Sequence, residues 1–309
     1  MEAAPFHRDV APGPPGERAR WIVTADGVRL RAVCWPRAGA RGTVLLLQGR
    51  TEYLEKYADA ARELATRGWA TAGVDWRGQG LSFRAARDPR RGHVRNFNEF
   101  QHDLDALLEL CDRERMPRPW HMLAHSMGGL IGLRALRRGL PFTRAVFSAP
   151  MWGLPLAPHR RFLGWGLSAL AAASGLGERP APGPGRLADP ASAPFEGNLL
   201  TTDPEMFAWM KRQIASHPEL GLAGPSLGWV WAAFGEMHAL AREAAPAVPC
   251  LVFLGTDEDI VSADAVHVRA ASWPGAWVES VEGARHEVLM EGPATRRRVY
   301  DAIARHLAG

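Results

Sequence analysis

Cysteine and lysine are scarce in this chain of 309 residues. The three cysteines, Cys34, Cys111 and Cys250, lie in apolar or helical contexts, and none belongs to a CxxC pair. This pattern argues against a disulfide framework and against a zinc site, and it favours a reducing compartment, so we expect a cytoplasmic protein. Lysine occurs only at Lys56 and Lys211, so the formal net charge of +4 comes almost entirely from arginine. The arginines are scattered and accompany no recognition motif, so we expect no nucleic-acid partner.

Long hydrophobic runs are also missing. The most apolar stretch, residues 162–173, is far shorter than the roughly 20 residues that span a bilayer, so we predict no transmembrane helix. Residues 1–20 hold four prolines and several charges but no apolar segment, which is not the pattern of a secretory signal peptide. We interpret residues 1–20 as a flexible N-terminal arm.

Apolar segments of strand length alternate with segments of helical periodicity along most of the chain. Helical spacing is clear in residues 59–66, 100–115, 127–138 and 294–307. Apolar strands separated by helices predict an α/β protein with a mostly parallel central sheet and helices on both faces, with the first strand or two antiparallel at one edge. The expected strands are residues 28–35, 43–47, 69–74, 120–124, 145–148, 250–254 and 277–281.

The alternation stops between residues 150 and 246, where proline and glycine and then aromatic residues become frequent. We therefore predict a core made of residues 21–150 and 247–309, with residues 151–246 inserted into it. The aromatic side chains of the insertion would either line an apolar pocket or form a small core of their own. They are Trp152, Trp165, Trp209, Trp229, Trp231 and Phe234.

Ser126 stands between an expected strand and an expected helix, in the run Leu-Ala-His-Ser-Met-Gly-Gly of residues 123–129. A serine on such a sharp turn adopts strained backbone geometry, and its neighbours two positions away must be small. Ala124 and Gly128 meet this requirement. The turn exposes the hydroxyl at the carboxyl end of the sheet, so we predict that Ser126 is a nucleophile.

A serine nucleophile needs an imidazole to take its proton and a carboxylate to orient that imidazole. His286 follows the last expected strand, and a loop with three carboxylates, Asp257, Glu258 and Asp259, follows the strand before it. The order serine, acid, histidine matches hydrolases that carry a serine on such a turn. The register of the acid loop favours Glu258, with Asp257 and Asp259 as alternatives.

Two backbone N–H groups would stabilise the negative charge that develops on the substrate carbonyl oxygen. We assign one to Met127, directly after the nucleophile, and the other to Arg50, in the loop after the strand of residues 43–47. The side chain of Arg50 either contacts the substrate or is a surface charge, and we favour the surface charge.

Four segments together resemble one family. They are Gln-Gly-Arg-Thr-Glu (48–52), Asp-Trp-Arg-Gly-Gln-Gly-Leu-Ser (75–82), the serine turn (124–129) and the histidine loop (283–290). They are similar to bacterial lysophospholipases related to monoglyceride lipases, among the S33-type serine hydrolases of the α/β-hydrolase fold. Residues 198–204 and 217–220 also look like this group, although Gln48 stands where monoglyceride lipases usually have histidine. The resemblance implies that the insertion is a helical cap over the active site.

The combined interpretation is a serine hydrolase that cleaves a lysophospholipid or monoacylglycerol ester through an acyl-enzyme, without a metal or an organic cofactor. Two alternatives stay open: an esterase, amidase or acyltransferase acting on a small soluble substrate, and a non-catalytic binding protein on the same scaffold. The apolar stretch that includes Trp165, Leu167 and Leu170 would either pack on the core or contact the inner face of a membrane. The sequence predicts no oligomeric state.

Overall fold

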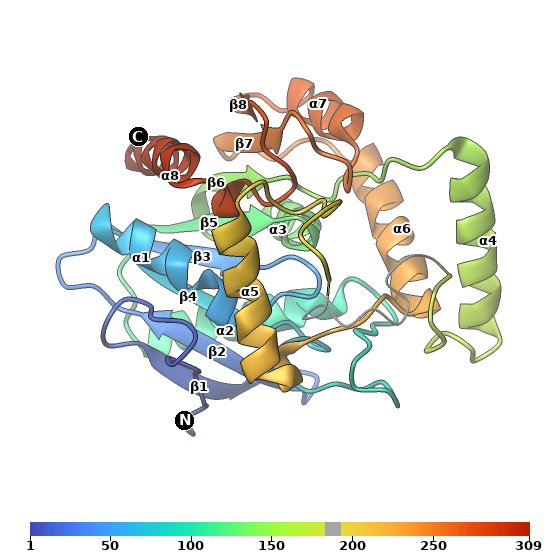
Figure 1. Ribbon diagram of the computed structural model, residues 1–309, viewed down its shortest axis with the longest axis horizontal. Coiled ribbons are helices and arrows are strands. Elements are labelled where there is room, and N and C mark those ends of the chain that lie inside the picture. Colours follow the sequence, from blue (N-terminus) through green and yellow to red (C-terminus); the bar gives the residue numbers. More distant parts are fainter. Residues whose placement is uncertain (183–192) are drawn as a thin grey trace.

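The computed structural model describes residues 1–182 and 193–309, and an eight-stranded sheet runs through its centre (Figure 1). The strands lie in the order β1-β2-β4-β3-β5-β6-β7-β8. All neighbouring pairs from β4 to β8 in this order are parallel, whereas β2 pairs antiparallel with both β1 and β4. The expected mostly parallel sheet with an antiparallel edge is confirmed. The strands are β1 (Arg18–Val23), β2 (Arg29–Trp35), β3 (Thr43–Leu47), β4 (Ala70–Val74), β5 (Trp120–His125), β6 (Phe142–Ser148), β7 (Cys250–Gly255) and β8 (Ala276–Val281).

Helices cover both faces of the sheet because its central strands are apolar on both sides. Within β3, Val44 and Leu46 face one core, and Leu45 and Leu47 face the other. The first core also contains α1 (Ala58–Thr66) and α8 (Pro293–Ala308). The second contains α2 (Glu99–Arg113), α3 (Met127–Arg137), part of α6 (Leu227–Arg242) and α7 (Ala263–Ala271). A strand buried on both faces is the physical reason for the continuous apolar runs in the sequence.

The N-terminal segment that we expected to be a loose arm is docked on the edge of the sheet. Backbone hydrogen bonds join Ala4 to Ala19 and Trp21 to Glu2, and β1 already begins at Arg18. Farther along the segment, Ala11 is fully buried. The segment satisfies backbone groups that an edge strand otherwise leaves unpaired, which explains why it is held in place.

The insertion lies between β6 and β7 and contains α4 (Pro158–Ala173), α5 (Pro204–Ser216), the short 3-10 helix η3 (Pro218–Leu220) and α6. Figure 1 shows α4 on the outside of the molecule, beside α6 and away from the sheet. Arg134 of α3 pairs with Glu236 and Glu243 at the C-terminal end of α6, so the insertion is anchored on the helix that follows Ser126. In the described parts of the chain, no helix is both long enough and apolar enough to cross a membrane.

Candidate active site

Ser126 sits at the sharp turn between β5 and α3, in the middle of the sheet. Its backbone has φ of 51° and ψ of −117°, a conformation that L-residues rarely adopt. The turn passes very close to β3: a Cβ added to Gly128 would lie 2.1 Å from the carbonyl oxygen of Leu47. The small residue two positions after Ser126 is therefore a steric requirement of this turn, and the strained conformation presents the hydroxyl at the carboxyl end of the sheet.

His286 approaches Ser126 from the loop between β8 and the 3-10 helix η4 (Val288–Met290). Its Nε2 atom lies 2.9 Å from the Oγ atom of Ser126. Its Nδ1 atom lies 2.8 Å from the Oε2 atom of Glu258. Because a carboxylate can only accept, Nδ1 carries the proton and leaves Nε2 free to accept the proton of the serine hydroxyl.

Glu258 is the carboxylate that contacts the histidine. Its other oxygen, Oε1, accepts hydrogen bonds from the backbone N–H groups of Ile260 and Val261, at 2.6 and 2.9 Å. Burial raises the pKa of Glu258, but the hydrogen bond from His286, its charge and the two backbone donors outweigh burial and hold the pKa below its usual value. Asp257 and Asp259, the two alternatives, are exposed. Of the three carboxylates, the structure places Glu258 beside His286.

Two backbone N–H groups near Ser126 are available to a ligand. In the loop after β3, Gly49 donates to Glu52, and Thr51 donates to the side-chain oxygen of Gln79 at 3.0 Å. Neither Arg50 nor Met127 donates its backbone N–H to an acceptor within the described residues. These are the two groups that the sequence analysis assigned to the oxyanion.

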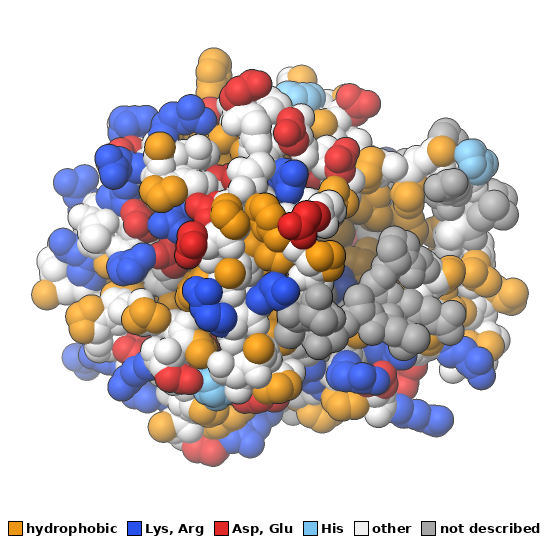
Figure 2. Space-filling view, in the orientation of Figure 1, with side chains coloured by type: hydrophobic (Ala, Val, Ile, Leu, Met, Phe, Trp, Pro, Cys, Tyr) orange, Lys and Arg blue, Asp and Glu red, His pale blue; other side chains and the backbone are white. Residues whose placement is uncertain are grey.

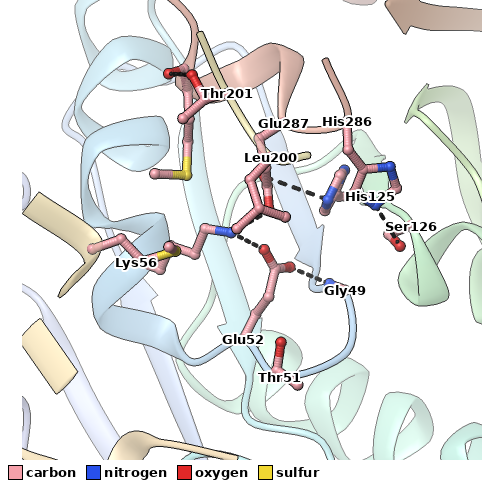
Figure 3. A network of polar contacts seen from close by, with 12 residues as sticks. Gly49, Thr51, Glu52, Lys56, His125, Ser126, Leu200, Thr201, His286 and Glu287 are labelled. Atoms are coloured by element: carbon pink, nitrogen blue, oxygen red, sulfur yellow. Dashed lines mark hydrogen bonds and ion pairs between the residues drawn. The ribbon is translucent and has the colours of Figure 1, made fainter. Parts of the chain in front are cut away.

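A buried network of charges lies behind this site and was not anticipated (Figure 3). The Lys56 ammonium bridges the carboxylates of Glu52 and Glu287, and all three side chains are almost completely buried. Glu52 also accepts hydrogen bonds from Gly49 and from the hydroxyl of Tyr57. Burial lowers the pKa of Lys56, but the charges of Glu287 and Glu52 raise it above its ordinary value. The lysine therefore stays protonated and compensates the buried carboxylates.

The network reaches both reacting residues through their neighbours in the chain. His125, which precedes Ser126, donates from Nδ1 to the carbonyl oxygen of Ser148 at 3.0 Å and places Nε2 3.3 Å from Glu287. Glu287 directly follows His286 in the chain. The imidazole rings of His125 and His286 are tilted against each other, with centroids 4.7 Å apart. His125 thus has a structural position, and it connects the serine turn to the histidine loop.

The Arg50 side chain is not a surface charge, contrary to our expectation. Its Nη2 atom donates to the carbonyl oxygen of Ala223 at 2.7 Å, and its guanidinium carbon lies 5.2 Å from the ring centroid of Trp229. Both partners belong to the insertion. The side chain turns inward because the loop after β3 lies under that part of the insertion.

Within the described parts of the chain, two clusters of side chains have the composition of metal ligands. The first is Glu52, His125 and Glu287, where the Lys56 ammonium already occupies the position of a cation. The second is His7, Asp9 and His217, in which the imidazole rings stack at 3.6 Å with an interplanar angle of 17°. Nitrogen lone pairs of nearly parallel rings do not converge on one point, so this arrangement does not suit a shared tetrahedral ion.

An apolar cavity of about 520 Å³ opens between α4 and α6. Its volume falls within the range of roughly 300–1,000 Å³ for small-molecule pockets. Figure 2 shows the surface hollowed between the sheet domain and α4, with hydrophobic side chains at its border. Of the six aromatic residues singled out in the insertion, Trp229 and Phe234 line this cavity. Its other lining residues include Leu154, Leu156, Leu167, Leu227, Val230 and Met237.

This arrangement agrees with a comparison of the sequence with known families. Residues 38–293 match the model of the serine aminopeptidase S33 family. The chain belongs to this family. This S33 hydrolase is 33% identical over 296 residues to lysophospholipase L2 of Escherichia coli K12, covering 90% of the chain and 84% of that protein. It is 30% identical over 276 residues to the probable lysophospholipase L2 of Haemophilus influenzae, covering 88% and 86%.

Solved structures confirm the α/β-hydrolase fold. A soluble variant of monoglyceride lipase from Saccharomyces cerevisiae superposes with a TM-score of 0.72 at 21% identity, covering 94% of both chains. A thermostable carboxyl esterase from Bacillus coagulans gives a TM-score of 0.77 at 15% identity, covering 95% of this chain and 98% of that one. At these sequence identities the likeness to solved structures shows the fold alone. Membership of the family rests on the family match and on the two lysophospholipase L2 relatives.

Proposed function

We propose that this S33 hydrolase cleaves the ester bond of a lysophospholipid or monoacylglycerol through an acyl-enzyme formed on Ser126. The observation that carries the proposal is the continuous chain of hydrogen bonds from Ser126 through His286 to Glu258. Such a relay turns a weakly nucleophilic hydroxyl into an effective one.

In the first half of the reaction, the Oγ atom of Ser126 attacks the ester carbonyl carbon while its proton passes to Nε2 of His286. The N–H groups of Arg50 and Met127 donate to the resulting oxyanion. Glu258 stabilises the imidazolium and holds its orientation. The tetrahedral adduct collapses when the carbon–oxygen bond to the glycerol breaks, and His286 returns the proton to the departing alcohol.

In the second half, His286 removes a proton from a water molecule, which attacks the acyl-enzyme at the same carbonyl. The second tetrahedral adduct releases the fatty acid, and the proton returns to Ser126. The reaction involves no oxidation or reduction, and water is the co-substrate. Every proton moves through the same imidazole, which is why a single histidine serves both halves.

The lipid substrate is supported by two independent observations. Relatives that align along most of the chain carry the names lysophospholipase L2 and probable lysophospholipase L2. The apolar cavity between α4 and α6 has the lining that an acyl chain requires. We assign this cavity to the acyl chain and residues 151–246 to a cap that supplies it.

Fluorophosphonate labelling tests the nucleophile: the wild type should react and Ser126→Ala should not. A series of p-nitrophenyl esters tests the substrate class, with kcat/KM expected to rise from acetate to octanoate. A steep preference for acetate would count against the lipid substrate and favour a small soluble ester. Absence of labelling in the wild type would favour a binding protein without catalysis.

We also propose that the enzyme works at the cytoplasmic face of a membrane, with α4 as its contact. Trp165, Leu167 and Leu170 on α4 are 44%, 48% and 68% exposed. Large apolar side chains exposed together on one helix suit the boundary between headgroups and acyl chains. The three cysteines are free thiols, as a reducing compartment requires. Phe162 and Leu163, which the sequence analysis included in this stretch, have side chains outside the described part.

A further inference from the structure

The guanidinium of Arg50 differs from those of Arg31 and Arg77 in having no carboxylate partner among the described residues. Arg31 pairs with Glu55 and Asp75, and Arg77 pairs with Asp103 among others. Among the described residues, by contrast, no carboxylate pairs with Arg50, whose one hydrogen bond goes to the carbonyl oxygen of Ala223. Its Nε atom is buried without any partner. Most of the donors on this side chain are therefore available.

The charge of Arg50 is desolvated but not neutralised. Burial lowers its pKa to about 10, so the guanidinium is still protonated near neutral pH. A buried cation without a counter-ion is unfavourable, and an anion that reaches it gains both the Coulomb attraction and the empty hydrogen-bond positions. The residue as a whole is nevertheless partly exposed to solvent.

The position of Arg50 connects the reacting centre to the apolar cavity. Its backbone N–H is one of the two groups proposed to bind the oxyanion, and its guanidinium packs on Trp229. Trp229 in turn lines the cavity between α4 and α6. Arg50 therefore lies between the reacting centre and the apolar cavity, where the polar part of a bound lipid ester would meet its acyl chain. The extended length of an arginine side chain is comparable to the separation of the ester carbonyl and the phosphorus in a lysophospholipid.

We infer that Arg50 binds the phosphodiester of the substrate headgroup and makes this hydrolase prefer anionic lysophospholipids over neutral monoacylglycerols. The inference rests on the proposed function and narrows it from two lipid classes to one. The planar fork of a guanidinium matches two phosphate oxygens, and such charge-assisted hydrogen bonds are about twice as strong as neutral ones. A monoacylglycerol offers only a hydroxyl at this position.

The main test compares kcat/KM for oleoyl lysophosphatidylglycerol and for mono-oleoylglycerol in the wild type and in Arg50→Gln. The backbone N–H is retained, so a change in the ratio of the two constants reports on the guanidinium. In Arg50→Gln we expect the ratio of kcat/KM for oleoyl lysophosphatidylglycerol to kcat/KM for mono-oleoylglycerol to fall about 10- to 100-fold. This is the effect of losing a hydrogen bond to a charged group. Arg50→Lys keeps the charge but not the fork, and should give an intermediate ratio. An unchanged ratio in Arg50→Gln would overturn the inference.

Arg84 provides the matched control. Its guanidinium also holds the insertion, donating to the carbonyl oxygens of Glu219 and Gly221 at 2.6 and 3.0 Å, and it donates to Gly80 and Pro89 as well. Arg84→Gln therefore weakens the attachment of the insertion without removing unoccupied guanidinium donors, and the substrate ratio should stay at the wild-type value. A fall as large as that in Arg50→Gln would assign the effect to attachment of the insertion and refute headgroup binding.

A second readout does not depend on lipid turnover. Glycerol 3-phosphate should inhibit hydrolysis of p-nitrophenyl butyrate more strongly than glycerol does, and Arg50→Gln should weaken this inhibition about 10-fold. If the wild type hydrolyses the soluble ester but neither lipid, the proposed substrate fails while this measurement still decides the anion site. Equal inhibition by glycerol and glycerol 3-phosphate would reject the anion site even if both lipids are hydrolysed.

Discussion

The carboxylate of Glu52 accepts a hydrogen bond from the backbone N–H of Gly49, the residue immediately before Arg50. The same carboxylate holds the ammonium of Lys56, which also binds Glu287 beside His286. The loop proposed to bind the oxyanion and the loop that carries the histidine are thus tied to one buried cation. Their separation is set by this contact, and the geometry of the reaction depends on that separation.

Lys56→Met should destabilise the protein and lower its activity together. The substitution leaves two buried carboxylates without their cation, which costs about 3–5 kcal/mol of unfolding free energy. Urea denaturation and kcat for p-nitrophenyl butyrate measure the two effects. Lys211→Met is the control because Lys211 is the other lysine of the chain and, within the described residues, donates to the carbonyl oxygen of Ala193 and to no carboxylate. Equal unfolding free energies for the two variants would contradict the role of the network.

Glu258→Gln should reduce kcat about 10³- to 10⁴-fold, with little change in the unfolding transition. The amide keeps the shape of the side chain but removes the charge that stabilises the imidazolium and fixes its tautomer. Asp257→Asn and Asp259→Asn change exposed carboxylates of the same loop and should retain most of the wild-type kcat. Steady-state kinetics of the three variants decide the assignment, which fails if either aspartate variant is the inactive one.

Gly128→Ala should reduce kcat about 100-fold or more, since an ångström-scale displacement at the reacting centre has an effect of that order. The new Cβ would lie 2.1 Å from the carbonyl oxygen of Leu47, and a backbone atom cannot move aside cheaply. Gly235→Ala on the exposed side of α6 meets no atom within 4 Å and should stabilise the protein by about 0.5–1 kcal/mol. Full activity of Gly128→Ala would show that the turn tolerates displacement.

The stability of the protein should fall between about pH 6.5 and pH 4, in part because of His121. Burial and the charges of Arg144 and His306 lower the pKa of His121 to about 4, against roughly 6.5 in the unfolded chain. In this window the unfolded chain binds a proton that the folded protein does not, so acid favours unfolding. The contribution has a slope of at most about 1.4 kcal/mol per pH unit.

Denaturant titrations of His121→Gln across this pH range should show a shallower decline than the wild type. His267→Gln, at an exposed position on α7, is the matched histidine-to-glutamine variant for comparison. Parallel curves for the wild type and His121→Gln would mean that His121 is not the group being protonated.

Trp165→Asp should weaken co-sedimentation with anionic liposomes if α4 is the membrane contact. The ring of Trp165 is 44% exposed and stacks on Trp231 at 5.3 Å, so a charge at this position replaces apolar surface with a strongly hydrated group. Trp277→Asp on β8 alters a tryptophan that is 68% exposed elsewhere and should bind like the wild type. Unchanged binding of Trp165→Asp would exclude α4 as the contact.

The features predictable from sequence were those with a local signal. Seven strands were predictable because they are apolar runs. The serine turn was predictable from its small neighbouring residues, and the histidine loop from its place in the chain order. Glu258 followed from the register of its loop. β1 was missed because it lies at the sheet edge and mixes polar with apolar residues. The segment that precedes it contains prolines and charges, which hide the start of the strand.

The charge network and the environment of Arg50 have no local signal. Glu52, Lys56 and Glu287 are ordinary surface residue types, and only the folded chain brings positions 52 and 287 to one ammonium. The inward direction of Arg50 likewise depends on the insertion that covers its loop. A buried charge is favourable only when its partner is present, so its placement is a property of the tertiary structure.

The two ends of the lysine network also lie far apart in the order of synthesis. Glu52 and Lys56 leave the ribosome before the insertion is made, and Glu287 follows only after β7 and β8. Until that last segment arrives, the lysine lacks one of its two carboxylates and His125 lacks its acidic neighbour. The active site therefore forms only after β8 and the histidine loop have been synthesised.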